Sequence, residues 1–338
     1  MTSNDFVDPA AGFSMVADCP GDYSHRCTVG IGRTRDGGRT WQPVRVLHLR
    51  YRGRGPHDEL AEGLAFANRK VGWLFGSRTL VTRDGGTTWI PQRLPPTAVA
   101  LEVARGTAWV LAGRCPSGCP LRLFTSGVGG FRWRPTPSQP GDFREARLVA
   151  LTDRDAFVLG VRRLVGSPPG ILAATHDGGS SWRLTRAPCG PHWSDLVAAD
   201  VDRLWLACAE EPTSTYEAGT LYRSVDGGRS WRLAARTHGY PFHPRRGVPD
   251  FPSFGTLGEV SVVSGGGLLM SRDTALTRVL LSVDGGRHWR SVLSDGGGGA
   301  DLQFVDPNHG WAFSWGPNRL YRTVDGGRHW TVVARTRS

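Results

Sequence analysis

The sequence predicts an all-β protein assembled from repeated four-stranded units, and three observations support this prediction. The 46 glycines, 23 prolines and 13 tryptophans of the 338-residue chain indicate many short strands joined by tight turns. An octapeptide with the pattern Ser/Thr-x-Asp-Gly-Gly-x-x-Trp recurs along the chain. Each copy is surrounded by the same succession of strand-like segments, which indicates an internal structural repeat.

The spacing of the octapeptide copies gives the length of the repeat. Six complete copies place aspartates at Asp36, Asp84, Asp177, Asp226, Asp284 and Asp325, with spacings of 48, 93, 49, 58 and 41 residues. One interval is about twice the others, and it contains a seventh copy, SGVGGFRW at 126–133, which carries Val128 in the aspartate position. The sequence therefore contains seven units with a mean spacing of about 48 residues.

Each unit contains four strand-like segments in the same order. In the last unit they are DLQFVD, HGWAFSW, RLYRTVDGG and HWTVVAR. Four short strands in about 40 to 50 residues are typical of a β-propeller blade. We predict a single seven-bladed β-propeller over residues 1–338, with antiparallel blades at about 1–46, 59–94, 98–136, 144–186, 193–236, 258–294 and 300–336.

The two ends of the chain fit complete blades. FVDPAAGF at 6–13 matches FVDPNHGW at 304–311, so the chain begins in the first strand of one blade and ends in the fourth strand of another. We therefore expect that the first and last blades share no strand.

The octapeptide is predicted to form the hairpin between the third and fourth strands of each blade. The aspartate accepts hydrogen bonds from the turn, the glycines tolerate positive φ, and the Ser or Thr hydroxyl adds a local bond. The tryptophan is expected to pack between blades; the seven are Trp41, Trp89, Trp133, Trp182, Trp231, Trp289 and Trp330. A calcium loop needs several oxygen ligands, whereas each octapeptide supplies one carboxylate. A catalytic aspartate would not be needed six times in one protein. The structural interpretation is favoured.

The formal net charge is +11, and Lys70 is the only lysine. Two interpretations of this arginine excess stay open: a dispersed, solvated surface in a protein from a G+C-rich genome, or a surface for an anionic partner. Exposed tyrosines are too few to indicate nucleic-acid binding. There is no apolar run long enough for a transmembrane helix, and the N-terminus lacks the features of a signal peptide.

The six cysteines form three pairs that are close in sequence, and we predict the disulfides Cys19–Cys27, Cys115–Cys119 and Cys189–Cys208. Disulfides persist in oxidising compartments, so we expect an extracytoplasmic or secreted protein whose leader lies upstream of Met1. Free cysteines would instead indicate the cytoplasm.

The octapeptide resembles the Asp-box, or BNR, repeat of bacterial sialidases and sortilin-type receptors. Together with the segments VGWLFGS and HGWAFSW, it makes the chain most similar to the photosystem II stability/assembly factor-like group of the sialidase superfamily. His288 and His329 depart from the pattern, since a hydroxyl residue usually precedes the tryptophan. The resemblance implies the propeller fold and a binding role like that of an assembly factor.

Propeller topology places the loops between blades, and those between second and third strands, opposite the octapeptide hairpins. We predict that these loops form an arginine-rich rim for a protein or peptide, particularly an acidic one. The rim residues are Arg50, Arg52, Arg54, His57, Arg114, Arg162, Arg163, His238, Tyr240, His243, Arg245 and Arg246. We expect a monomeric, non-catalytic binding propeller.

The alternative is an exo-sialidase-like glycoside hydrolase acting on an anionic glycan at the same rim. Tyr216 would be the nucleophile, with Glu210 or Glu217 as its activating carboxylate. The early Arg-Ile-Pro motif of sialidases is missing, which argues against this alternative. His238, His243 and Asp250 have the residue types of a metal site, but neighbouring prolines favour an ordered surface loop, and we predict no metal or cofactor.

Overall fold

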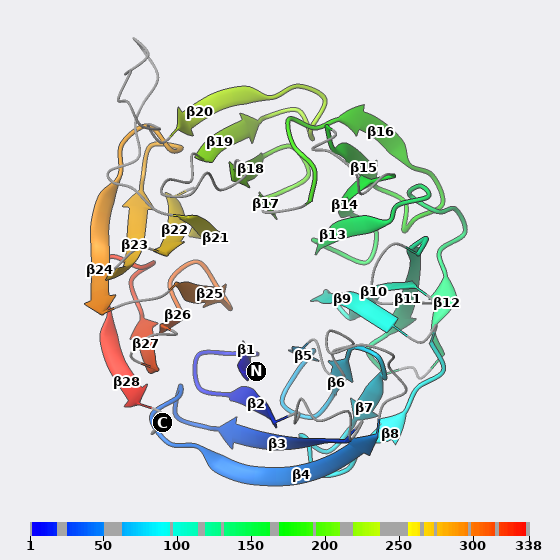
Figure 1. Cartoon of the computed structure of the whole chain (residues 1–338), viewed down its shortest axis with the longest axis vertical. Helices are drawn as coiled ribbons and strands as arrows, with labels where there is room; N and C mark the ends of the chain where they lie inside the picture. Colours follow the sequence, from blue (N-terminus) through cyan, green and yellow to red (C-terminus); the bar gives the residue numbers. More distant parts are fainter. Residues whose placement is uncertain are drawn as a thin grey trace. The chain divides into compact units, whose positions relative to one another are not determined.

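A computed structural model of the chain describes residues 2–18, 26–50, 63–94, 97–113, 119–129, 132–162, 169–191, 194–209, 219–236, 256–263, 267–273, 276–296, 299–314 and 318–335. These residues form 28 strands and no helix, arranged in seven four-stranded sheets. Within each sheet, four consecutive strands lie side by side in chain order (Figure 1). The predicted all-β, seven-bladed propeller is confirmed.

The chain divides into two compact units, Met1–Leu184 and Thr185–Ser338, with the boundary inside strand β16. The blades of unit 1 are β1 (Thr2–Phe6), β2 (Gly12–Asp18), β3 (Arg26–Thr34) and β4 (Gln42–Arg50); β5 (Gly63–Phe66), β6 (Gly72–Phe75), β7 (Leu80–Thr82) and β8 (Ile90–Pro91); β9 (Thr97–Ala104), β10 (Thr107–Gly113), β11 (Arg122–Gly127) and β12 (Arg134–Pro135); β13 (Glu145–Ala150), β14 (Ala156–Val161), β15 (Ile171–Thr175) and β16 (Arg183–Arg186).

Numbered along the chain, the four blades of unit 1 are blades 1 to 4, and unit 2 holds blades 5 to 7. Their strands are β17 (Ser194–Ala198), β18 (Leu204–Ala209), β19 (Gly219–Ser224) and β20 (Arg232–Arg236); β21 (Thr256–Val263), β22 (Gly267–Asp273), β23 (Leu276–Ser282) and β24 (Arg290–Gly296); β25 (Ala300–Phe304), β26 (Gly310–Ser314), β27 (Arg319–Thr323) and β28 (Thr331–Arg335). Blade 1 consists of β1–β4 and blade 7 of β25–β28, so the described strands of these two blades are not shared.

A large apolar side chain occupies the same position of the second strand in every blade. None of these seven side chains is more than 2% exposed: Phe13, Trp73, Trp109, Phe157, Trp205, Leu269 and Trp311. Burying a side chain of this size contributes roughly 1.5–3 kcal/mol or more to folding. The repeated position therefore gives each blade its own anchor in the core.

The octapeptide tryptophans lie against the clusters that join successive blades. Trp89 packs with residues of blades 1 and 2, Trp133 with blades 2 and 3, and Trp182 with blades 3 and 4. Trp289 and Trp330 do the same in unit 2. A hairpin residue thus contributes to adhesion between blades as well as to its own turn.

The FVDPAAGF and FVDPNHGW match has a steric cause. A Cβ placed on Gly12 would lie 2.4 Å from the ring of Phe6, and a Cβ on Gly310 would lie 2.4 Å from the ring of Phe304. The first-strand phenylalanine therefore covers the first residue of the second strand, where only glycine leaves room. Blade 2 repeats the arrangement with Phe66 over Gly72.

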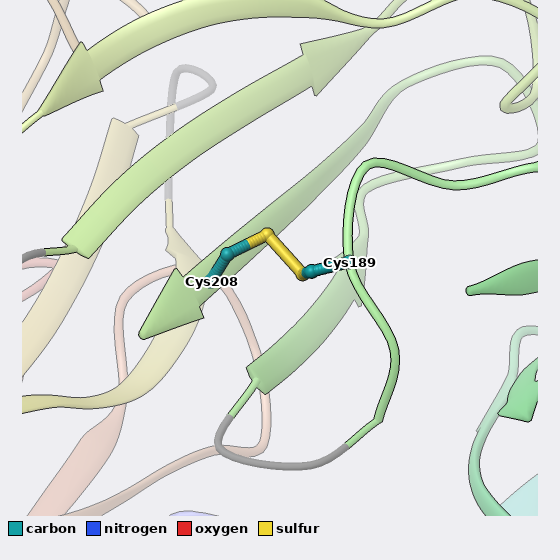
Figure 2. The surroundings of a disulfide bond; sticks show 2 residues. All are labelled: Cys189 and Cys208. Carbon is teal, nitrogen blue, oxygen red and sulfur yellow. A yellow bond between two sulfur atoms is a disulfide. The ribbon is translucent and has the colours of Figure 1, made fainter. Parts of the chain in front are cut away.

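A disulfide joins Cys189 and Cys208, with sulfur atoms 2.08 Å apart (Figure 2). It ties the segment before β17 to the second strand of blade 5. Cys27 and Cys119 are also disulfide-bonded. The cysteines that we predict as their partners, Cys19 and Cys115, lie outside the described residues.

Candidate functional site

The octapeptide hairpins form a closed network of hydrogen bonds. In blade 1, Thr34 Oγ1 donates to Asp36 Oδ1 at 2.8 Å and accepts from the Gly38 amide at 2.9 Å. Asp36 Oδ1 accepts from the Thr40 amide at 2.9 Å, and Oδ2 accepts from the Thr40 hydroxyl at 2.6 Å. Trp41 Nε1 donates to the Gly38 carbonyl at 3.1 Å. Both carboxylate oxygens are thus used within the turn.

These hydrogen bonds lower the pKa of the octapeptide carboxyls. The bond from the Thr40 hydroxyl is the main cause of a pKa of about 2 for Asp36. Ser181 and Ser230 donate in the same way and hold the pKa values of Asp177 and Asp226 at about 2. A carboxylate that is ionised and already engaged by its own turn is suited to bracing a hairpin rather than to proton transfer.

Five of the octapeptide hairpins are also tied to the turn between the first two strands of their blade. The first glycine amide donates to that turn's carbonyl in five blades: Gly37 to Ala10, Gly85 to Lys70, Gly178 to Arg154, Gly227 to Asp202 and Gly326 to Asn308, at 2.7–3.0 Å. Both turns therefore lie at the same end of the blade. We call this end the octapeptide side.

A cavity of about 530 Å³ opens on the octapeptide side between blades 1 and 2, both within unit 1. Ala11 and Phe13 supply apolar lining, and Thr34 lies beside them. The charged lining consists of five basic residues and one acidic residue: Arg33, Arg35, Arg69, Lys70, Arg83 and Asp84. The only lysine of the chain lies in this cluster.

Arg33 is held in place by its neighbours. It lies directly across from Phe13 in the register of β3 and β2, and its Nη1 is 3.4 Å from where a Cβ on Gly85 would stand. Its Nε is buried and has no hydrogen-bond acceptor among the described residues. The Nη groups of Arg33 are not among the buried unpaired atoms, so they are the donors through which this arginine can bind an oxyanion in the cavity.

The other charges of the cavity are unequally engaged. Arg69 binds Asp8 through two hydrogen bonds of 2.7 and 3.0 Å, and this interaction is the main cause of the lowered pKa of Asp8. Burial raises the pKa of Asp84, but hydrogen bonds from Thr88 and Thr82 outweigh it and leave the pKa below its usual value. Arg35 and Lys70 are exposed. The net charge of the cavity lining is therefore positive and favours an anionic ligand.

Most of the predicted rim lies outside the described residues. Arg162 follows β14 and is exposed, and Arg50 is the last residue of β4. The remaining rim residues are not described: Arg52, Arg54, His57, Arg114, Arg163, His238, Tyr240, His243, Arg245 and Arg246. The alternative catalytic residues Tyr216, Glu210 and Glu217 are not described either, nor is Asp250. The rim stays a prediction.

The cavity was not predicted from the sequence, although its residues carried a signal. Arg35 and Arg83 are the second residues of two octapeptides, at a position that varies from copy to copy. Arg69 and Lys70 belong to the turn against which the second octapeptide packs. Their convergence follows from the contact between that turn and the hairpin, which spacing alone did not reveal. In the part of the chain that the structure describes, no three His, Cys, Asp or Glu residues gather as a metal site.

No protein-family model and no curated protein sequence matches this chain. Several solved structures are similar to this chain. YCF48 bound to a D1 peptide aligns with a TM-score of 0.53 and 21% identity over 80% of this chain and 79% of its own. A prolyl endopeptidase aligns with a TM-score of 0.58 and 13% identity over 98% of this chain and 49% of its own.

A third structure is the GH74 enzyme of Niastella koreensis, with a TM-score of 0.40 and 13% identity over 96% of this chain and 61% of its own. The likenesses to YCF48 and to the prolyl endopeptidase show the propeller fold. Among the described residues there is no helix long and apolar enough to cross a membrane.

Proposed function

We propose that this protein is a non-catalytic, extracytoplasmic binding propeller that engages an acidic segment of a protein or peptide partner. The observation that carries the proposal is the cavity between blades 1 and 2, where five basic residues surround one carboxylate. Arginine side chains bind carboxylates through paired, charge-assisted hydrogen bonds, so such a cluster favours acidic side chains.

Two likenesses support a peptide as the partner. YCF48, which shares the fold, has been solved with a D1 peptide bound to it. The octapeptides resemble Asp boxes, and the chain resembles the photosystem II assembly factor-like group. The predicted rim around Arg162 belongs to the same proposal as a second cationic surface, because a long acidic segment can be contacted at more than one place.

The experiment measures the affinity of a fluorescent peptide containing consecutive Glu and Asp residues, against the same peptide with Gln and Asn. We expect the acidic peptide alone to bind, with an affinity that falls as salt is raised. Arg35→Gln with Arg83→Gln should weaken binding by roughly tenfold or more, since each charge-assisted bond contributes about 1.5–3 kcal/mol.

Arg229→Gln with Arg287→Gln is the matched control, because both are exposed octapeptide arginines of unit 2 that are remote in sequence from the cavity. Arg162→Gln tests the rim. Equal affinity for the acidic and neutral peptides would refute the proposed function. A loss with Arg162→Gln alone would refute the cavity and move the site to the rim.

The extracytoplasmic location is part of the proposal and rests on the disulfides. Cys189 and Cys208 are bonded, and Cys27 and Cys119 are bonded as well. Peptide mapping of unreduced protein from its native host should find no free thiol and the pairs Cys19–Cys27, Cys115–Cys119 and Cys189–Cys208. Free thiols at these positions would contradict this location.

A further inference from the structure

The octapeptides of unit 2 differ from those of unit 1 at their second residue. Blades 1, 2 and 4 carry Arg35, Arg83 and His176 there, whereas blades 5, 6 and 7 carry valine. Val225, Val283 and Val324 are 58%, 64% and 59% exposed, the highest values among the large hydrophobic residues that the structure describes. Single exposed apolar residues are common on protein surfaces, so these valines indicate a contact surface only together with a second feature beside them.

Close to the first two of these valines lies an arginine that matches Arg33 of the cavity. Arg223 lies across from Trp205 in the register of β19 and β18, and its guanidinium carbon is 5.6 Å from the centre of the Trp205 ring. Its Nη1 is 3.3 Å from where a Cβ on Gly285 would stand, so the side chain reaches from blade 5 to the blade 6 hairpin. Val225 and Val283 each lie two residues from one of these contacts.

The guanidinium of Arg223 still has capacity to bind an anion. Its Nε is buried and has no hydrogen-bond acceptor among the described residues. The carboxylates of the two hairpins are already engaged: Asp226 accepts from Ser224 and Ser230, and Asp284 accepts from Ser282 and His288. Neither carboxylate binds Arg223, so its Nη groups, which unlike Nε are not buried, can bind the carboxylate of a ligand.

We propose that the octapeptide side of blades 5 and 6 is a second binding site, which takes a peptide segment with an aliphatic side chain next to a carboxylate. The carboxylate binds Arg223, and the aliphatic side chain covers Val225 and Val283. As in the cavity of unit 1, an arginine of the third strand reaches the octapeptide hairpin of the next blade. Valines occupy the octapeptide position at which the cavity has Arg35 and Arg83. The site therefore favours a mixed apolar and acidic segment, whereas the cavity favours a purely acidic one. The proposal of this second site does not depend on the function proposed for the cavity.

The test uses the full chain and three peptides of equal length with the repeats Leu-Glu, Ser-Glu and Leu-Gln. We expect the Leu-Glu peptide to bind about tenfold or more tightly than the other two, because only it supplies both contacts. Val225→Ser with Val283→Ser should reduce Leu-Glu binding by about tenfold and leave Ser-Glu binding unchanged. Arg223→Lys should also weaken Leu-Glu binding, because lysine lacks the planar pair of donors.

Two controls keep the outcomes distinct. Val46→Ser changes a valine of β4 that is 54% exposed and should have no effect. The serine variants change exposed turn residues, so thermal unfolding should match the wild type. Unchanged Leu-Glu binding in the Val225 and Val283 double variant would overturn the inference. Loss of Leu-Glu binding with Arg35→Gln and Arg83→Gln instead would also overturn it, while supporting the cavity as the peptide site.

Discussion

The Nδ1 atom of His288 lies 2.6 Å from Oδ2 of Asp284, in the place that the Thr40 hydroxyl takes beside Asp36. His329 makes the same 2.6 Å contact with Asp325 in blade 7. The two copies that depart from the Ser/Thr pattern therefore preserve its chemistry, since a ring N–H can donate where an O–H does. What the hairpin requires at this position is a donor, not a hydroxyl.

This equivalence gives a first prediction. His288→Thr should leave stability nearly unchanged, whereas His288→Ala removes the donor and should lower the free energy of unfolding by about 0.5–1.5 kcal/mol. Urea denaturation at neutral pH measures both. Equal losses for threonine and alanine would show that the imidazole contributes through something other than this bond.

A second prediction concerns Gly85, the first glycine of the blade 2 hairpin. Its φ is +69°, and a Cβ there would lie 2.9 Å from the carbonyl oxygen of Arg69. Gly106 has a similar φ of +86°, but no atom lies within 4 Å of the place where a Cβ would stand. Alanine at this position therefore measures only the free-energy cost of a positive φ. Gly106→Ala should cost about 1–2 kcal/mol, and Gly85→Ala clearly more, in the same denaturation assay. Equal losses would mean that the turn yields to the extra methyl group.

A third prediction concerns acid. The pKa values of Asp36, Asp177 and Asp226 are about 2, below the value of about 3.9 in an unfolded chain. The folded state therefore binds these protons more weakly, and the stability that the carboxylates contribute is complete above about pH 4 and lost as the pH falls towards about 2. The melting temperature should drop across this window.

The control for the acid prediction is Asp226→Asn. This variant should melt at a lower temperature at neutral pH, because it weakens the hydrogen bond from Ser230, and should show a shallower decline in acid because one titrating group is gone. A wild-type melting temperature that stays constant down to about pH 2.5 would contradict the coupling between these carboxylates and folding.

Much of the fold was predictable because the octapeptide combines local turn chemistry with a fixed place in the blade. The aspartate, the glycines and the tryptophan each act within a few residues of one another, so spacing alone located seven hairpins and seven sheets. Val128 did not disturb this count. Its amide donates to the Gly106 carbonyl at 2.8 Å, which ties the third hairpin to its neighbouring turn without an aspartate.

The cavity was not predictable in this way, because its residues come from different turns. Arg35, Lys70 and Arg83 are separated by 35 and 13 residues and meet only because the hairpin of blade 2 is bonded to the turn that carries Lys70. Variation at one position of the repeat marks these arginines, but it does not show which of them come together until the repeat is folded. The prediction from sequence placed the site in the long loops instead, where insertions stand out.

A polar cluster joins blades 6 and 7 within unit 2. Asp295 of β24, whose side chain is 7% exposed, accepts hydrogen bonds from the Tyr321 hydroxyl and from Arg319 Nη1, the latter at 2.8 Å. Burial, followed by the bond to Asp295, raises the pKa of Tyr321 above its ordinary value. The phenol is therefore protonated at neutral pH and donates to the carboxylate.

The fourth prediction is that Tyr321→Phe destabilises the protein by about 1–3 kcal/mol, because it leaves a buried carboxylate short of a donor. Tyr222 occupies the same position of the third strand in blade 5, and its hydroxyl makes no hydrogen bond to another described residue. Tyr222→Phe is thus a matched control and should stay within about 0.5 kcal/mol of the wild type. Since both variants remove one oxygen from the same strand position, a difference between their unfolding free energies measures the Asp295 bond. If the two variants unfold alike, the cluster does not hold blades 6 and 7 together.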